Sequence, residues 1–156
     1  MDFQRQIARR LHEEHAATLE LWSRVEQTIG KRGAELEALI GRAAAALADD
    51  VARHFGFEET ELFPRLTEAG EGDIAELLRE EHGVIRGAAA QFDALARQLR
   101  AGELDDAGWQ RLRVTALELA ERLVSHVQKE EMSLLPALED LLDEATDAEL
   151  ALAYAG

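Results

Sequence analysis

The chain of 156 residues contains no cysteine. Disulfides, thiolate metal sites and a cysteine nucleophile are therefore excluded. Aromatic residues make up only 5% of the chain and proline occurs only twice, whereas alanine, leucine, glutamate and arginine dominate. This composition is typical of helices rather than of a sheet.

Positive charge is also scarce, because 17 Lys and Arg residues face 32 Asp and Glu residues and give a net charge of -15. A chain this acidic is repelled by nucleic acid and by anionic membranes, so we expect neither as a partner. No apolar run is long enough to span a bilayer, and the N-terminal segment MDFQRQIARRLHEEH lacks the apolar core of a signal peptide. We therefore expect a cytoplasmic protein. The hydrophobic fraction of 47% and the length predict a single domain over residues 1–156, with its core at about 3–142.

The chain contains an internal repeat. Residues 54–64 read HFGFEETELFP and residues 126–136 read HVQKEEMSLLP, and both prolines of the chain fall on this frame. A shorter tag, Glu-Glu-His, precedes each frame at residues 13–15 and 80–82. The chain is therefore predicted to consist of two related halves, each a pair of helices.

The apolar residues recur at helical spacing in four long segments. These segments cover residues 3–29, 34–66, 74–100 and 107–142. Pro64 predicts a kink or an end in the second helix, Asp73 is expected to cap the third helix, and Asp105 or Asp106 the fourth. A short helix is expected after Thr146 and Asp147. Four long helices with short connections predict an all-α, up-down-up-down four-helix bundle with a short C-terminal helix.

Six polar residues fall on the inward faces of these helices. They are His15, His54, Glu58, His82, His126 and Glu130. A lone inward histidine is usually a hydrogen-bonded core residue, but a buried carboxylate is costly unless it is paired or binds a metal. The inward stripes carry no lysine or arginine that would neutralise the two glutamates, whereas a bound pair of cations would satisfy all six groups.

The spacing of these residues fits a two-metal site. Residues four apart share a helix face, so each frame presents one histidine and one glutamate to the same centre. Pseudo-twofold symmetry predicts one ion at His15 and His54, a second at His82 and His126, and Glu58 and Glu130 as bridges. Imidazole and carboxylate donors without sulfur suit iron, and also manganese or zinc.

The two tags and the frames HxxxEExxLFP and HxxxEExxLLP resemble the hemerythrin-like, or HHE cation-binding, family over about residues 3–142. The resemblance implies a four-helix bundle holding two iron ions with an oxo or hydroxo bridge. It implies as partner a small oxidant or gas ligand, namely oxygen, peroxide or nitric oxide. The ligands it implies are His15, His54, Glu58, His82, His126 and Glu130.

The sequence departs from the oxygen-carrying hemerythrins at two positions. Arg86 stands where they have a further histidine, and Glu131 stands at the position of their fourth-helix carboxylate, although plus-four symmetry favours Glu130. His12 is either a fifth imidazole ligand or, as we favour, a polar residue at the edge of the site. A ligand vacancy favours peroxide or nitric oxide chemistry, or iron sensing, over oxygen carriage, so the chain is either an enzyme or a binding protein.

Glutamates beside the proposed ligands have a second role available, since metal-bound histidines need acceptors for their other N–H group. The candidates are Glu59, Glu61 and Glu131. For Glu59 we favour a solvent-exposed position instead.

Overall fold

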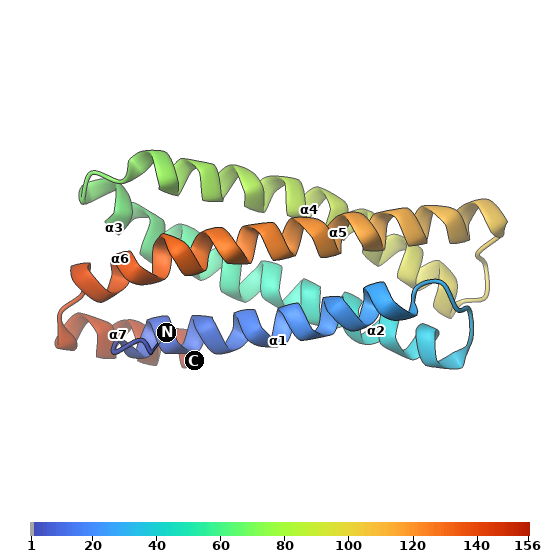
Figure 1. Ribbon diagram of the computed structural model, residues 1–156, viewed down its shortest axis with the longest axis horizontal. Coiled ribbons are helices and arrows are strands. Elements are labelled where there is room, and N and C mark those ends of the chain that lie inside the picture. The colour runs from blue at the N-terminus through green and yellow to red at the C-terminus, as the bar shows by residue number, and fades with distance from the viewer. Residues whose placement is uncertain (1) are drawn as a thin grey trace.

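The computed structural model describes residues 2–156, which are helical with no β-strand among them. The long helices lie side by side in an elongated bundle, and the C-terminal helix α7 lies beside α1 (Figure 1). The elements in order are α1 (Gln6–Thr28), α2 (Ala34–Asp49), η1 (Asp50–Phe55), η2 (Glu58–Leu62), α3 (Phe63–Glu68), α4 (Gly72–Arg100), α5 (Asp106–Met132), α6 (Leu134–Leu141) and α7 (Glu144–Ala155). The predicted up-down-up-down bundle with a short C-terminal helix is therefore confirmed.

Two of the predicted long helices are subdivided. The second continues from Ala34 to Glu68 but changes to π-helical geometry in η1 and η2, and Pro64 lies in the first turn of α3 that follows. A proline is tolerated there because the first helical turn does not need its missing N–H group. The fourth predicted helix is interrupted at Ser133, where α5 ends and α6 begins, three residues before Pro136.

The observed helix caps agree in part with those predicted from the sequence. Asp105 caps α5, since its carboxylate accepts a hydrogen bond from the Gly108 N–H at 2.7 Å. The prediction for Asp73 is wrong: α4 already begins at Gly72, which puts Asp73 inside the first turn. Its charge still complements the helix dipole there. The last helix begins at Glu144, earlier than expected, because Asp143 caps it.

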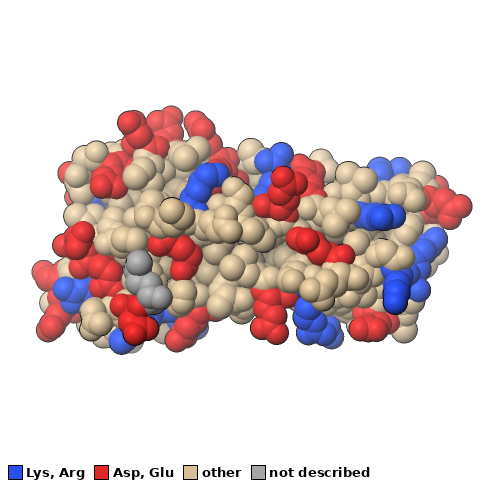
Figure 2. All heavy atoms as spheres, viewed as in Figure 1, with Lys and Arg blue, Asp and Glu red and all other residues tan. Residues whose placement is uncertain are grey.

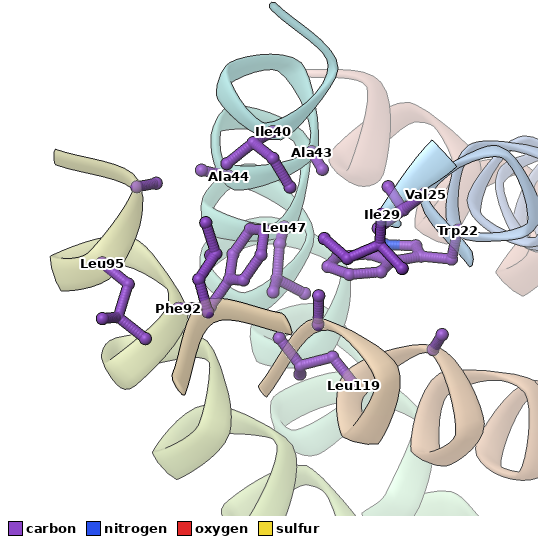
Figure 3. Close-up of a cluster of buried hydrophobic side chains, with 14 of the residues drawn as sticks. Trp22, Val25, Ile29, Ile40, Ala43, Ala44, Leu47, Phe92, Leu95 and Leu119 are labelled. Carbon is purple, nitrogen blue, oxygen red and sulfur yellow. The ribbon is translucent and has the colours of Figure 1, made fainter. Parts of the chain in front are cut away.

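The apolar core consists of two clusters along the bundle axis. One cluster fills the half where α1 meets α2 and includes Trp22, Leu47, Phe92 and Leu119 (Figure 3). The other fills the opposite half, with residues from α1, α3, α4, α6 and α7. On each long helix, the inward polar residues lie between residues of the two clusters. The six residues therefore form a buried polar layer between two apolar layers.

The surface carries the excess of negative charge. Asp and Glu side chains spread over the visible face and gather around the end that contains α7 (Figure 2). Within residues 2–156, no helix combines the length and the apolar character needed to cross a membrane.

Candidate metal centre

The six inward polar side chains meet in the middle of the bundle. All six are at most 4% exposed. Their ligand atoms form two overlapping groups, each compact enough to hold one metal ion. These groups are His15, His54, Glu58 and Glu130, and Glu58, His82, His126 and Glu130.

Each of the two carboxylates lies between histidines of the two groups. Glu58 has one oxygen 3.1 Å from Nε2 of His54 and the other 3.2 Å from Nε2 of His82. Glu130 has one oxygen 2.9 Å from Nε2 of His15 and the other 3.1 Å from Nε2 of His126. Both glutamates are therefore placed as bridges between two histidine pairs.

The outward nitrogen of each of these histidines donates to another glutamate. Nδ1 of His54 lies 3.0 Å from Glu14, and Nδ1 of His126 lies 2.8 Å from Glu81. In both cases the glutamate comes from the tag of the same half of the chain.

The tag histidines instead use the frame of the other half. Nδ1 of His15 lies 2.7 Å from Glu131, and Nδ1 of His82 lies 2.7 Å from Glu59. These four bonds place a proton on every Nδ1 and leave every Nε2 to face the centre, which is the tautomer that a metal-binding histidine needs.

The four outer glutamates are held in turn by basic groups. Arg86 donates two hydrogen bonds to Glu59, at 2.7 Å and 3.0 Å. Glu14 is bound by Arg53 and by the Tyr154 hydroxyl. Lys129 contacts Glu81, and His12 contacts Glu131.

The centre is therefore lined by acceptors that face one another. The Nε2 atoms of His82 and His126 are only 3.0 Å apart. Glu58 Oε1 and Glu130 Oε2 are buried without a hydrogen-bond partner, although each lies near a histidine nitrogen. Lone pairs and ionised carboxylates at these distances require positive charge between them, supplied either by protons or by metal ions.

The close contacts between the histidines and the glutamates also shift the pKa values of these groups. Burial lowers the pKa of His15, but its hydrogen bonds to Glu130 and Glu131 outweigh burial and raise the pKa to about 9. Burial also opposes protonation of His82, yet Glu130 and Glu58 raise its pKa to about 9. Burial would raise the pKa of Glu130, but the surrounding histidines hold it well below its usual range. Without metal the site thus attracts protons, and a metal ion must displace them to bind.

In a comparison with known families, the model of the hemerythrin HHE cation binding domain matches residues 6–138. The chain belongs to this family. No individual curated protein matches the chain. Membership in the hemerythrin HHE family implies a cation site built from histidine and glutamate groups, and the buried cluster supplies them.

The residues that set this hemerythrin domain apart lie outside the six inner groups. Arg86 binds Glu59 and does not reach the centre. His12 contacts Glu131, which is one of the outer glutamates. Glu131 accepts the Nδ1 proton of His15, which is the role that the sequence suggested for it. The favoured solvent-exposed position of Glu59 is wrong, because the carboxylate lies between His82 and Arg86.

Sequence reasoning missed Glu14 and Glu81, and with them the groups that hold these two glutamates, namely Arg53, Tyr154 and Lys129. A signal for the first two was present, since the glutamate before the histidine recurs in both tags. Tyr154 lies outside both copies of the repeat and had no such signal.

Proposed function

We propose that this hemerythrin domain binds two iron ions, one at His15 and His54 and the other at His82 and His126. Glu58 and Glu130, whose two oxygens face histidines of different pairs, would be shared by both ions. The observation that carries the proposal is the set of buried acceptors facing one another, with every Nδ1 proton directed outward. Imidazole and carboxylate donors suit iron, and manganese or zinc fits the same set.

The centre then serves to bind or react with a small oxidant ligand, namely oxygen, hydrogen peroxide or nitric oxide. Bound iron supplies the redox chemistry and a coordination position for such a ligand. The protein supplies orientation through the four outer glutamates and shelter from water through aromatic rings. Phe55 stacks on His82 with ring centroids 3.8 Å apart, and the Phe63 ring lies 5.3 Å from it. The binding of a small oxidant ligand and the cytoplasmic location are both predictions from the sequence.

Iron loading in air tests this function. The iron-loaded wild type is expected to show near-ultraviolet absorption from an oxygen bridge to iron, and hydrogen peroxide or nitric oxide is expected to change that spectrum. The double variant Glu58→Ala, Glu130→Ala removes both bridging carboxylates and should lose the band. A wild type without the band, or a double variant that keeps it fully, would refute the proposal.

A second candidate is a metal- or oxygen-sensing module whose fold responds to metal loss. It is favoured by the burial of all six groups, because an empty site leaves their charges uncompensated unless protons bind. Amide exchange and thermal unfolding, measured with and without metal, distinguish this candidate. A sensor should open α1 or α4 when metal is removed, and identical exchange in both states would exclude it.

A further inference from the structure

Tyr154 connects the C-terminal helix to the metal centre. It is the only tyrosine of the chain and lies on α7, beyond the residues that match the family (Figure 1). Its hydroxyl donates to Glu14 Oε1 at 2.5 Å, and its ring meets the His54 ring edge-on, with centroids 6.3 Å apart. The residue is only 5% exposed. A side chain outside the repeat thus acts on the hydrogen-bond partner of a proposed ligand.

The position of Tyr154 does not depend on its hydroxyl group. The Asp147 carboxylate accepts hydrogen bonds from the N–H groups of Gln6 and Ile7, at 2.8 Å and 3.0 Å, and so joins α7 to the first turn of α1. Leu150 and the Tyr154 ring pack in the apolar cluster of that end. Loss of the hydroxyl alone should leave α7 in place.

The position of Glu14 does not depend on Tyr154 either. Arg53 donates to both carboxylate oxygens of Glu14, at 3.1 Å and 3.2 Å, and Arg10 donates to Oε2 at 3.1 Å. Oε1 accepts three donors at once, because His54 Nδ1 lies 3.0 Å from it, beside the hydroxyl and Arg53. Tyr154 therefore competes with His54 for the same oxygen.

This competition is expected to weaken His54 as a metal ligand. A carboxylate that accepts the Nδ1 proton makes the imidazole a stronger donor at Nε2. A short hydrogen bond from a hydroxyl withdraws negative charge from that carboxylate. Among the outer glutamates, Glu59, Glu81 and Glu131 have a basic partner and no tyrosine hydroxyl.

We propose that Tyr154 is a positioning residue of the metal centre, which acts through Glu14 to lower the affinity of the His15–His54 position for its ion. The inference rests on the two-ion centre proposed above. It makes α7 part of the site and the two metal positions unequal.

A titration with Co²⁺, followed by cobalt absorption and chelator competition, tests this inference. Tyr154→Phe should bind one of the two ions several-fold more tightly and shift its cobalt spectrum. Glu14→Gln should bind the same ion about 10- to 100-fold more weakly. If Tyr154 acts through Glu14, adding Tyr154→Phe to Glu14→Gln should change nothing further.

Asp147→Asn in the Tyr154→Phe background is the matched control, since it loosens α7 when the hydroxyl is already absent. It should lower the melting temperature and leave both Co²⁺ affinities at the Tyr154→Phe values. A further change in either affinity would mean that the docking of α7, rather than the hydroxyl, sets the affinity, and would overturn the inference.

Fluorinated tyrosine supplies a graded test that reports on Tyr154 alone, because the chain has no other tyrosine. Mono- and difluorinated tyrosine are more acidic and donate more strongly, so affinity for the same ion should fall stepwise, opposite to Tyr154→Phe. If two ions bind but their affinities do not change with fluorination, or if Tyr154→Phe binds metal more weakly, this inference is overturned and the proposed function is not. A wild type that binds fewer than two Co²⁺ ions would overturn the proposed function as well.

Discussion

At the scale of single residues, neighbouring glutamates of each frame have opposite roles. Glu58 and Glu130 point inward and bridge the histidine pairs, whereas Glu59 and Glu131 face outward and accept the Nδ1 protons of His82 and His15. One residue step rotates a side chain by about 100° around a helix, so adjacent glutamates can serve the centre and its surroundings at once. The pair Glu-Glu in each frame is thereby explained.

Glu59→Gln tests the outer role at this scale. Loss of the charged acceptor should leave His82 poorly oriented and less basic, and should weaken metal binding about 10- to 100-fold without changing the number of ions. A chelator competition titration measures the affinity. The control is Glu61→Gln, because the Glu61 side chain is exposed and should leave the affinity at the wild-type value. Equal effects of the two substitutions would contradict the role of Glu59.

The inner residues were predictable from the sequence and most outer ones were not. His54 and Glu58 interrupt an apolar stripe at helical spacing, so their inward direction follows from periodicity alone. Glu14 and Glu81 lie on polar faces, and only the packing of four helices shows which histidine each one meets. The chemistry of Arg86 argues against it as a ligand, and its partner Glu59 depends on how α4 lies against η2.

At the scale of the elements, the two copies of the repeated frame differ in helix geometry. His54 lies in the π-helical η1 and Glu58 begins the π-helical η2, whereas His126 and Glu130 both lie in the regular helix α5. Short π-helical stretches occur frequently at functional sites. The two copies share the histidine, the two glutamates and the proline, so these residues alone do not distinguish the π-helical copy from the α-helical one.

The C-terminal helix supplies a prediction at the element scale. Asp147 is buried and accepts the N–H groups of Gln6 and Ile7 in the first turn of α1, where the N-cap residue Arg5 supplies no side-chain cap of its own. Asp147→Asn should therefore lower the free energy of unfolding by about 0.5–2 kcal/mol, the range for the loss of a helix cap. Urea unfolding followed by circular dichroism measures the change. Asp140→Asn, at an exposed position, should have no such effect. A stability loss shared by both variants would contradict the capping role of Asp147.

At the scale of the whole molecule, the repeat builds one site across both halves. Each tag glutamate serves the frame histidine of its own half, while each outward frame glutamate serves the tag histidine of the other half. The halves are therefore joined by the hydrogen bonds of the centre as well as by apolar packing. The match to the family ends at residue 138, yet α7 adds Asp147 and Tyr154 to the first half alone.

The stability of the metal-free molecule is predicted to depend on pH. His15 and His82 have a pKa of about 9 in the folded chain, above the ordinary histidine value of 6.5. Their contribution to stability is complete below the unfolded value and is lost as pH rises through about 9. Thermal unfolding of the metal-free protein should therefore show a lower melting temperature at about pH 9.5 than at about pH 7.

Metal binding should show the opposite dependence on pH. The ions displace protons from the histidines, so affinity should rise about tenfold per pH unit for each proton displaced, until the histidines are neutral. Titrations across this range should also detect proton release. Affinity that does not change with pH would mean that the histidines are not the ligands.

The number of metal ions per chain tests the central claim most directly. Elemental analysis of protein that is purified without chelator and loaded with iron should give two ions per wild-type chain. In Glu58→Gln, Glu130→Gln, which keeps the shape of both side chains, the content should fall below one ion per chain. A wild type without bound metal, or a variant that still holds two ions, would contradict a centre bridged by these glutamates.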